Sequence, residues 1–244
     1  MGNTFLCKFR MMKKIIFIML ITIKFYGQIN SGEITYQLSI GHDKELFEDK
    51  QLKPILEKAQ NGSKQITKSL IFNNESSLFT TNEGIDDEET YLAKAFTGGN
   101  NIYYTELKND TIIKQVDNNY GQYLINYLQK KDWLLSEETK LIDNFLCYKA
   151  TSQSIIVNSK GTFKYPIIAW YCPSIPFNYG PNGYNGLPGL ILEIQERNIT
   201  YGAIKIELNE TNIKISKPNK GKNISEEEYN NIIVKQKETI KNQN

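Results

Sequence analysis

A glycine-rich tract, FNYGPNGYNGLPGLILEI at residues 177–194, constrains the fold more than any other feature of this chain. Collagen needs glycine at every third position over many repeats, and four glycines inside a globular chain do not provide that. A phosphate-binding loop leads into a helix N-terminus, whereas this tract leads into LILEI, which is typical of a strand. We therefore predict a structural corner that feeds a buried β-strand. The glycines recur at Gly180, Gly183, Gly186 and Gly189.

The end of the tract has the residues of a tight turn. In LPGL, Pro188 presets the first central position of a type II turn, and Gly189 supplies the positive φ that the second position needs. A second interpretation is a rigid binding rim that displays Tyr179 and Tyr184, because aromatic side chains on tight turns suit contact surfaces. For these two tyrosines, a core role and a binding role stay equally open.

The N-terminus has the layout of a secretory signal peptide. Lys13 and Lys14 precede an apolar core over residues 15–23, and the small residue Gly27 precedes residue 28. The apolar core is much shorter than the roughly 20 residues with which a helix spans a bilayer. We interpret residues 1–27 as a signal peptide, with residues 1–11 as an upstream start extension. The mature chain is then exported, and it is periplasmic, outer-membrane-associated or secreted, with no transmembrane span.

Charge excludes one class of partner. Residues 1–27 hold five of the 29 basic residues, which leaves 24 against 27 acidic residues, a net charge of −3. Arg197 is the one arginine of the mature chain. Nucleic-acid binders need clustered Lys and Arg to neutralise phosphates, so we expect no nucleic-acid partner.

The pattern along the chain predicts a fold that is mainly β. GEITYQLSI, residues 32–40, alternates apolar and polar residues, as a half-buried strand does. Residues 43–60 are helix-like, with Pro54 as a kink or a second start, and Ser225 and Glu228 form a capping box for a C-terminal helix. About ten strands joined by short turns predict an antiparallel sheet. We expect an α+β fold, a curved open sheet or half-barrel with one or two packed helical regions and a C-terminal helix, and a single domain over residues 28–244.

The hexapeptide GLPGLI resembles the name-giving motif of the GLPGLI family, exported proteins found largely in the Bacteroidota. SLIFNNESSLF, DWLLSEETKLI, CYKAT and AWYCPSIPFNYGP resemble further blocks of that family in the expected order, from about residue 69 to residue 194. The resemblance implies export but no activity, since the family has none established, and its recurring residues look architectural. A likeness of the sheet to periplasmic lipoprotein carriers is a fold analogy that implies no function. The motif residues are Gly186, Leu187, Pro188, Gly189, Leu190 and Ile191.

Two cysteines, Cys147 and Cys172, remain after export and predict a disulfide bond. A hairpin centred between Ser159 and Lys160 places them opposite each other, at a separation that a disulfide tolerates. A bulge at Gly161 would shift this register by one residue. Two reduced structural thiols are the alternative. Cys172 also departs from the resemblance, because the GLPGLI family usually has another residue there.

Residues suited to catalysis are scarce. The chain has one histidine, His42, so neither a zinc centre of the usual type nor a Ser-His-Asp triad is expected, and we assign no metal, cofactor or catalytic residue. Glu193 draws notice as an acid that alternates with Ile191 and Gln195 in a predicted strand. It is functional if that face lines a cavity and ordinary if it faces outward. Trp170 either paves a groove or covers the sheet core.

Three hypotheses for function follow. We favour a non-enzymatic exported protein that binds a hydrophobic ligand or an envelope partner. The alternatives are a carboxylate-based enzyme on an envelope glycan or peptide, and a structural or assembly protein. The candidate binding residues are Trp170, Tyr179, Tyr184 and Glu193.

Overall fold

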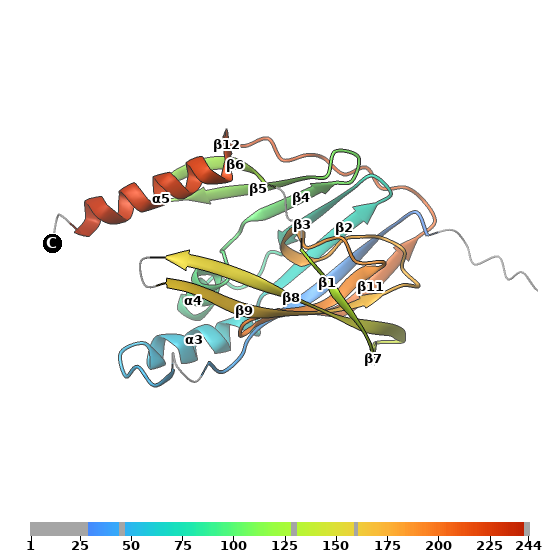
Figure 1. Cartoon of the computed structure of the whole chain (residues 1–244), viewed down its shortest axis with the longest axis horizontal. Coiled ribbons are helices and arrows are strands. Elements are labelled where there is room, and N and C mark those ends of the chain that lie inside the picture. The colour runs from blue at the N-terminus through green and yellow to red at the C-terminus, as the bar shows by residue number, and fades with distance from the viewer. Residues whose placement is uncertain (1–28, 44–46, 128–130, 159–160, 242–244) are drawn as a thin grey trace, which may run out of the picture.

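The computed structural model describes residues 29–43, 47–127, 131–158 and 161–241. One sheet of 12 strands, in the order β12-β6-β5-β4-β3-β2-β1-β11-β10-β9-β8-β7, forms its body. Its neighbouring strands are antiparallel except β12, which is parallel to β6. The sheet is open and strongly curved (Figure 1). The prediction of a mainly antiparallel α+β fold with an open curved sheet is confirmed.

The described elements follow the chain order. The strands are β1 (Ser31–Ile40), β2 (Thr67–Asn73), β3 (Ser76–Thr81), β4 (Ile102–Glu106), β5 (Thr111–Asn118), β6 (Gly121–Tyr127), β7 (Leu134–Ile142), β8 (Phe145–Asn158), β9 (Gly161–Cys172), β10 (Leu190–Glu196), β11 (Ile199–Asn209) and β12 (Lys222–Ser225). The helices are α3 (Lys53–Ser63), α4 (Glu88–Phe96), the short 3-10 turn η1 (Pro181–Gly183) and α5 (Glu226–Lys241).

The first residues of α3 and α4 have the local chemistry that favours a helix start. Pro54 lies in the first turn of α3, where its missing N–H costs no hydrogen bond. Of the two predicted alternatives, a kink or a second helix start, the structure contains the helix start, and residues 48–52 of the helix-like segment 43–60 are not helical. The acidic run before Tyr91 forms the start of α4. Asp87 accepts a hydrogen bond from the Thr90 N–H at 2.8 Å, and the Thr90 hydroxyl accepts one from the Asp87 N–H at 3.0 Å. Hydrogen bonds from Thr90 lower the pKa of Asp87, which favours the charged cap.

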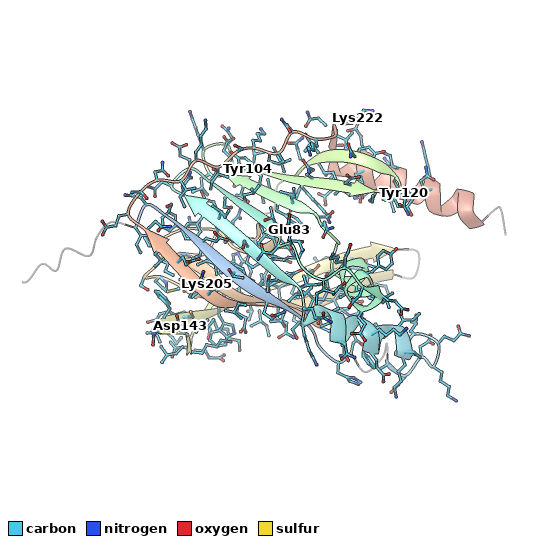
Figure 2. The ribbon with its side chains drawn as sticks, turned by 180° about the vertical axis from the view of Figure 1, so that it is seen from behind. Glu83, Tyr104, Tyr120, Asp143, Lys205 and Lys222 are labelled. Carbon is cyan, nitrogen blue, oxygen red and sulfur yellow. The ribbon has the colours of Figure 1, made fainter. Side chains whose placement is uncertain are left out.

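The helices α3, α4 and α5 lie on the open side of the molecule (Figure 1). Two arms of the sheet face each other there: the first arm is β4, β5 and β6, and the second arm is β8, β9 and β10. α5 lies along the first arm, and α3 and α4 lie beside the second (Figure 1). The view from behind shows α5 and α3 on the same side of the molecule (Figure 2).

The glycine-rich connection between β9 and β10, residues 173–189, fills the concave side of the sheet. The Leu190 N–H donates to the Ile175 carbonyl at 3.0 Å, and the Ile191 N–H donates to the Tyr179 carbonyl at 3.0 Å. From β1, the buried Tyr36 hydroxyl donates to the Ile191 carbonyl at 2.6 Å. Phe177 packs on Phe72 of β2 with ring centroids 4.7 Å apart. The predicted corner is therefore a buried plug that contacts strands far from it in sequence.

The turn inside this plug differs from the predicted type II turn. Gly189 has the expected positive φ, 152°. Its N–H donates to the Leu187 carbonyl at 2.8 Å, which makes a γ-turn around Pro188. A type II turn would use the Leu190 N–H to close on Leu187. That N–H bonds instead to the Ile175 carbonyl, so a tertiary contact determines the turn.

The β8–β9 hairpin confirms the predicted register without a bulge shift. Tyr148 lies opposite Tyr171, and Asn158 lies opposite Gly161, which places Cys147 and Cys172 on adjoining strands at the next step. The expected disulfide bond is absent: both cysteines are free, buried thiols. The Cys147 thiol donates to the Phe145 carbonyl at 3.6 Å, and the Cys172 sulfur lies 3.0 Å from the Ser174 hydroxyl oxygen. Interaction between the two thiols lowers the pKa of Cys172 and raises the pKa of Cys147. The alternative of two reduced thiols is the one that the structure contains.

Replacing Gly189 with alanine tests whether the close backbone approach at this residue stabilises the protein. A Cβ there would lie 2.3 Å from the Cys172 carbonyl oxygen, whereas a Cβ at Gly161, also with positive φ, meets nothing within 4 Å. We expect Gly189→Ala to lower the free energy of unfolding by about 3 kcal/mol and Gly161→Ala by about 1 kcal/mol. Urea titrations of both variants measure the difference. Equal losses would show that the close approach at Gly189 is unimportant.

Candidate binding groove

A groove opens between the two arms on the side marked by α3 and α5. Its main cavity has a volume of about 550 Å³. Cavities of about 130 and 230 Å³ adjoin it, and Glu196 lines all three. The main cavity is lined from the first arm, from β8, from the plug and from α5. The lining residues include Tyr103, Lys114, Tyr127, Lys131, Ser154, Ile156, Asn182, Tyr184, Glu196, Glu226, Tyr229 and Asn230.

A hydrogen bond between the plug and β10 lies at the centre of the groove. The Tyr184 hydroxyl donates to Glu196 Oε2 at 2.7 Å. Tyr184 is only 5% exposed. Burial and then the neighbouring Glu196 charge raise the pKa of Tyr184, so its hydroxyl remains a donor at neutral pH. Tyr184 directly follows η1, and Glu196 is the last residue of β10. The path of the plug therefore joins these two side chains.

Further tyrosines surround this pair. Burial is the main cause that raises the pKa of Tyr103 and Tyr127, and it raises the pKa of Tyr201 to about 12. The Tyr127 hydroxyl reaches the Asn182 carbonyl at 3.5 Å. These phenols are neutral near pH 7, so they present aromatic surface together with hydroxyl groups that donate and accept hydrogen bonds.

Two lysines bring positive charge to the same groove. Lys114 Nζ lies 5.7 Å from the centroid of the Tyr103 ring, and Lys131 Nζ lies 5.7 Å from the centroid of the Tyr184 ring. Burial lowers the pKa of Lys114, and the charge of Glu226 partly opposes that shift. With acids and amines among phenols, the groove is suited to a polar or amphipathic ligand.

Tyr179 and Tyr184, whose core or binding role the sequence left open, occupy different positions in the plug. Tyr184 lines the groove, whereas Tyr179 is 1% exposed and lies in the core beside Phe72. The Tyr179 hydroxyl is buried and has no hydrogen-bond partner among the described residues. Tyr184 belongs to the core cluster and also lines the groove, so its binding role stays a prediction, and Tyr179 lies in the core.

Trp170 and Glu193 lie on the outer face, away from the groove. Glu193 lies opposite Trp170 on β9, whereas the next residue, Ile194, lines the groove beside Tyr184. Glu193 accepts a hydrogen bond from Lys140 Nζ at 2.7 Å, and this Nζ lies 4.9 Å from the Trp170 ring centroid. Glu193 is thus a partly exposed acid in an ion pair, as its outward interpretation describes.

A β-bulge places Ile191 on the opposite face of β10 from the one that the sequence predicts. Strict alternation places Ile191 on the same face as Glu193. The β9–β10 register shifts between these residues, so Ile191 lies opposite Tyr171 while Glu193 lies opposite Trp170. Ile191 consequently faces the plug, where a Cβ on Gly180 would come within 2.7 Å of its Cδ1 atom. The extra residue at the bulge reverses the alternation.

Glu196 is the functional candidate that sequence analysis missed. The available signal was its place at the end of a strand, next to the Arg197–Asn198 turn, because binding residues are concentrated at loops. Among the described residues, no group of three or more His, Cys, Asp or Glu side chains is arranged to hold a metal ion. Within the same part of the chain, no helix combines the length and apolarity needed to cross a membrane.

Comparisons with known proteins bear on the plug and the fold. A family model described as a protein of unknown function (Porph_ging) matches residues 159–193, which cover β9, the plug and the start of β10. No curated protein matches the chain. The solved structure of PNGF-II is similar with a TM-score of 0.52 at 16% identity, over 84% of this chain and 33% of that one. This chain thus spans about a third of PNGF-II, and the likeness shows the fold alone.

Tyr184→Phe tests the central hydrogen bond. The change removes the donor to Glu196 and keeps the ring, so we expect the free energy of unfolding to fall by about 1–2 kcal/mol. Tyr123→Phe is the control, since the Tyr123 hydroxyl donates to an uncharged acceptor, the Tyr120 carbonyl. Thermal and urea unfolding compare the two variants. A Tyr184→Phe variant no less stable than Tyr123→Phe would contradict the assignment.

Proposed function

We propose that the chain is an exported, GLPGLI-like envelope protein of the Bacteroidota that binds an envelope partner in the groove without catalysis. Residues 1–27 act as its signal peptide, and residues 28–244 form one domain. The GLPGLI hexapeptide and the match to a family of unknown function fall on the same segment, the plug and its flanking strands. This overlap supports a protein whose most distinctive residues are architectural.

The Tyr184–Glu196 pair is the observation that carries the binding proposal. A buried phenol that donates to a partly buried carboxylate fixes both side chains in an open groove. Such fixed polar groups lose little entropy when a ligand binds. Around them, phenols and amines offer hydrogen bonds and aromatic surface to a partner surface of mixed polarity.

A hydrophobic ligand remains the second candidate, and we assign it to a small pocket beside the groove. The concave face that would hold a large apolar cargo is occupied by the plug. A smaller pocket of about 230 Å³ adjoins the groove at Glu196 and is mainly apolar. It suits an apolar side chain or a short acyl group. Its apolar residues are Ile40, Leu56, Phe96, Ile156 and Ile199.

Enzymatic turnover receives less support. Glu193, the acid on which a carboxylate mechanism was based, is paired with Lys140 on the outer face. In the groove, the Glu196 carboxylate accepts from Tyr184, which fits a binding role as well as a catalytic one. We therefore assign no catalytic residue.

Site-specific photo-crosslinking in whole cells tests the proposal. A benzophenone amino acid at Asn230, on the α5 side of the groove, should give a discrete adduct in the envelope fraction. Lys205, which is exposed on β11 and does not line the groove, is the control position and should give none. Glu196→Gln should reduce the adduct about tenfold by weakening partner contacts. Equal adducts at both positions, or none at Asn230, would contradict a groove-bound partner.

A further inference from the structure

The far half of β8 has a free edge. β8 pairs with β9 as far as Asn158 opposite Gly161. On its other side, the pairing with β7 stops at Leu134 opposite Thr151. Residues 152–158 therefore have a strand on one side only among the described residues. Along such an edge, alternate residues direct their N–H and C=O groups outward without a strand partner.

This edge lacks the protection that the other sheet edges have. β7 has a register shift between Leu135 and Thr139, and it carries charged residues over the same stretch. β12, at the opposite end, is only four residues long and runs directly into α5. Bulges, charges and short strands are the usual means of preventing edge pairing. The β8 edge SQSII, residues 152–156, has an unbroken register with β9 and no charge or proline.

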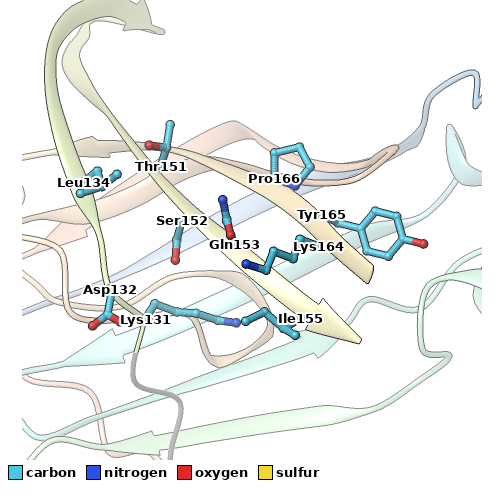
Figure 3. Close-up of a pocket in the computed structure, with 10 residues that line it drawn as sticks. All are labelled: Lys131, Asp132, Leu134, Thr151, Ser152, Gln153, Ile155, Lys164, Tyr165 and Pro166. Atoms are coloured by element: carbon cyan, nitrogen blue, oxygen red, sulfur yellow. The ribbon is translucent and has the colours of Figure 1, made fainter. Parts of the chain in front are cut away.

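Cavities lie on both faces of this free edge. On one face, Ser154 and Ile156 line the groove that contains Tyr184 and Glu196. On the other face, Gln153 and Ile155 line a cavity of about 760 Å³ (Figure 3). Alternate side chains of a strand point to opposite faces. A strand added here would therefore direct its side chains alternately into the two cavities.

The larger cavity has an excess of positive charge. Figure 3 shows Lys131 extending across the opening toward Ile155, with Lys164 on the β9 side and Asp132 beside Lys131. Among the described residues that line this cavity, two amines thus face one carboxylate. Lys131 also lines the groove on the other face of β8. An acidic side chain is the group that would best complement this cavity.

We propose that an extended, acidic peptide segment of a partner protein adds to β8 as a further strand along residues 152–157. Its main-chain groups bond to the free edge. An acidic side chain enters between Lys131 and Lys164, and its neighbours enter the groove beside Tyr184. Main-chain bonding supplies affinity in this mode, and the alternating pockets supply specificity. The proposal rests on the proposed function and names the element of the partner that binds.

Selection from a random octapeptide library displayed on phage, against the whole mature chain, tests this inference. We expect enriched peptides to carry Asp or Glu at alternate positions. Their synthetic forms should slow amide hydrogen exchange at residues 152–157. Methylation of the peptide nitrogens that face β8 should weaken binding about tenfold or more. Methylation of the alternate nitrogens, which face away from β8, should weaken it little. Lys131→Glu with Lys164→Glu should weaken binding about tenfold, and Lys205→Glu should leave it unchanged.

Three results would overturn the inference. The first is a selection without enrichment, and the second is binding that neither N-methylation nor the two lysine changes affect. The third is protection of residues 152–157 that rises with protein concentration alone, which would assign the edge to a second copy of this chain. If the edge fails these tests while the Asn230 adduct persists, the groove still binds a partner and only the strand-addition mode is wrong.

Discussion

Main-chain hydrogen bonds between the plug and β10 are the interaction on which the rest of the structure depends. The N–H groups of Leu190 and Ile191 bond to carbonyls of the plug, and Tyr36 bonds to the Ile191 carbonyl from β1. A buried, irregular segment is stable only if its polar backbone groups find partners. Here the first residues of β10 supply them. The plug can therefore cover the apolar side chains of a sheet that would otherwise leave its concave face open.

The groove follows from this arrangement. Tyr184, which lies within the plug, reaches Glu196 at the end of β10. The curvature of the sheet brings the first arm, with Tyr103 and Lys114, over the same place. A segment that resembles a turn-rich linker in sequence thus closes the core and positions the candidate binding residues.

The sequence predicts those features that local chemistry determines. Alternation predicted β1, the spacing of the β8–β9 hairpin predicted its register, and glycine at position 189 predicted a positive φ. Features that depend on tertiary contacts were missed. The γ-turn at Pro188 forms because the Leu190 N–H bonds to a residue 15 positions earlier, and the bulge after Ile191 reverses an alternation that the sequence presents as regular. The groove was missed for the same reason, since Tyr103, Lys114 and Glu196 lie on separate strands.

Amide hydrogen exchange of Leu190 and Ile191 in the mature protein tests the central role of the plug most directly. If their hydrogen bonds hold the plug in the sheet, both amides should exchange only through global unfolding, with the same free energy as amides of the central strand β1. Rapid exchange at these two amides, while β1 stays protected, would show that residues 173–189 form a surface loop and would contradict this account.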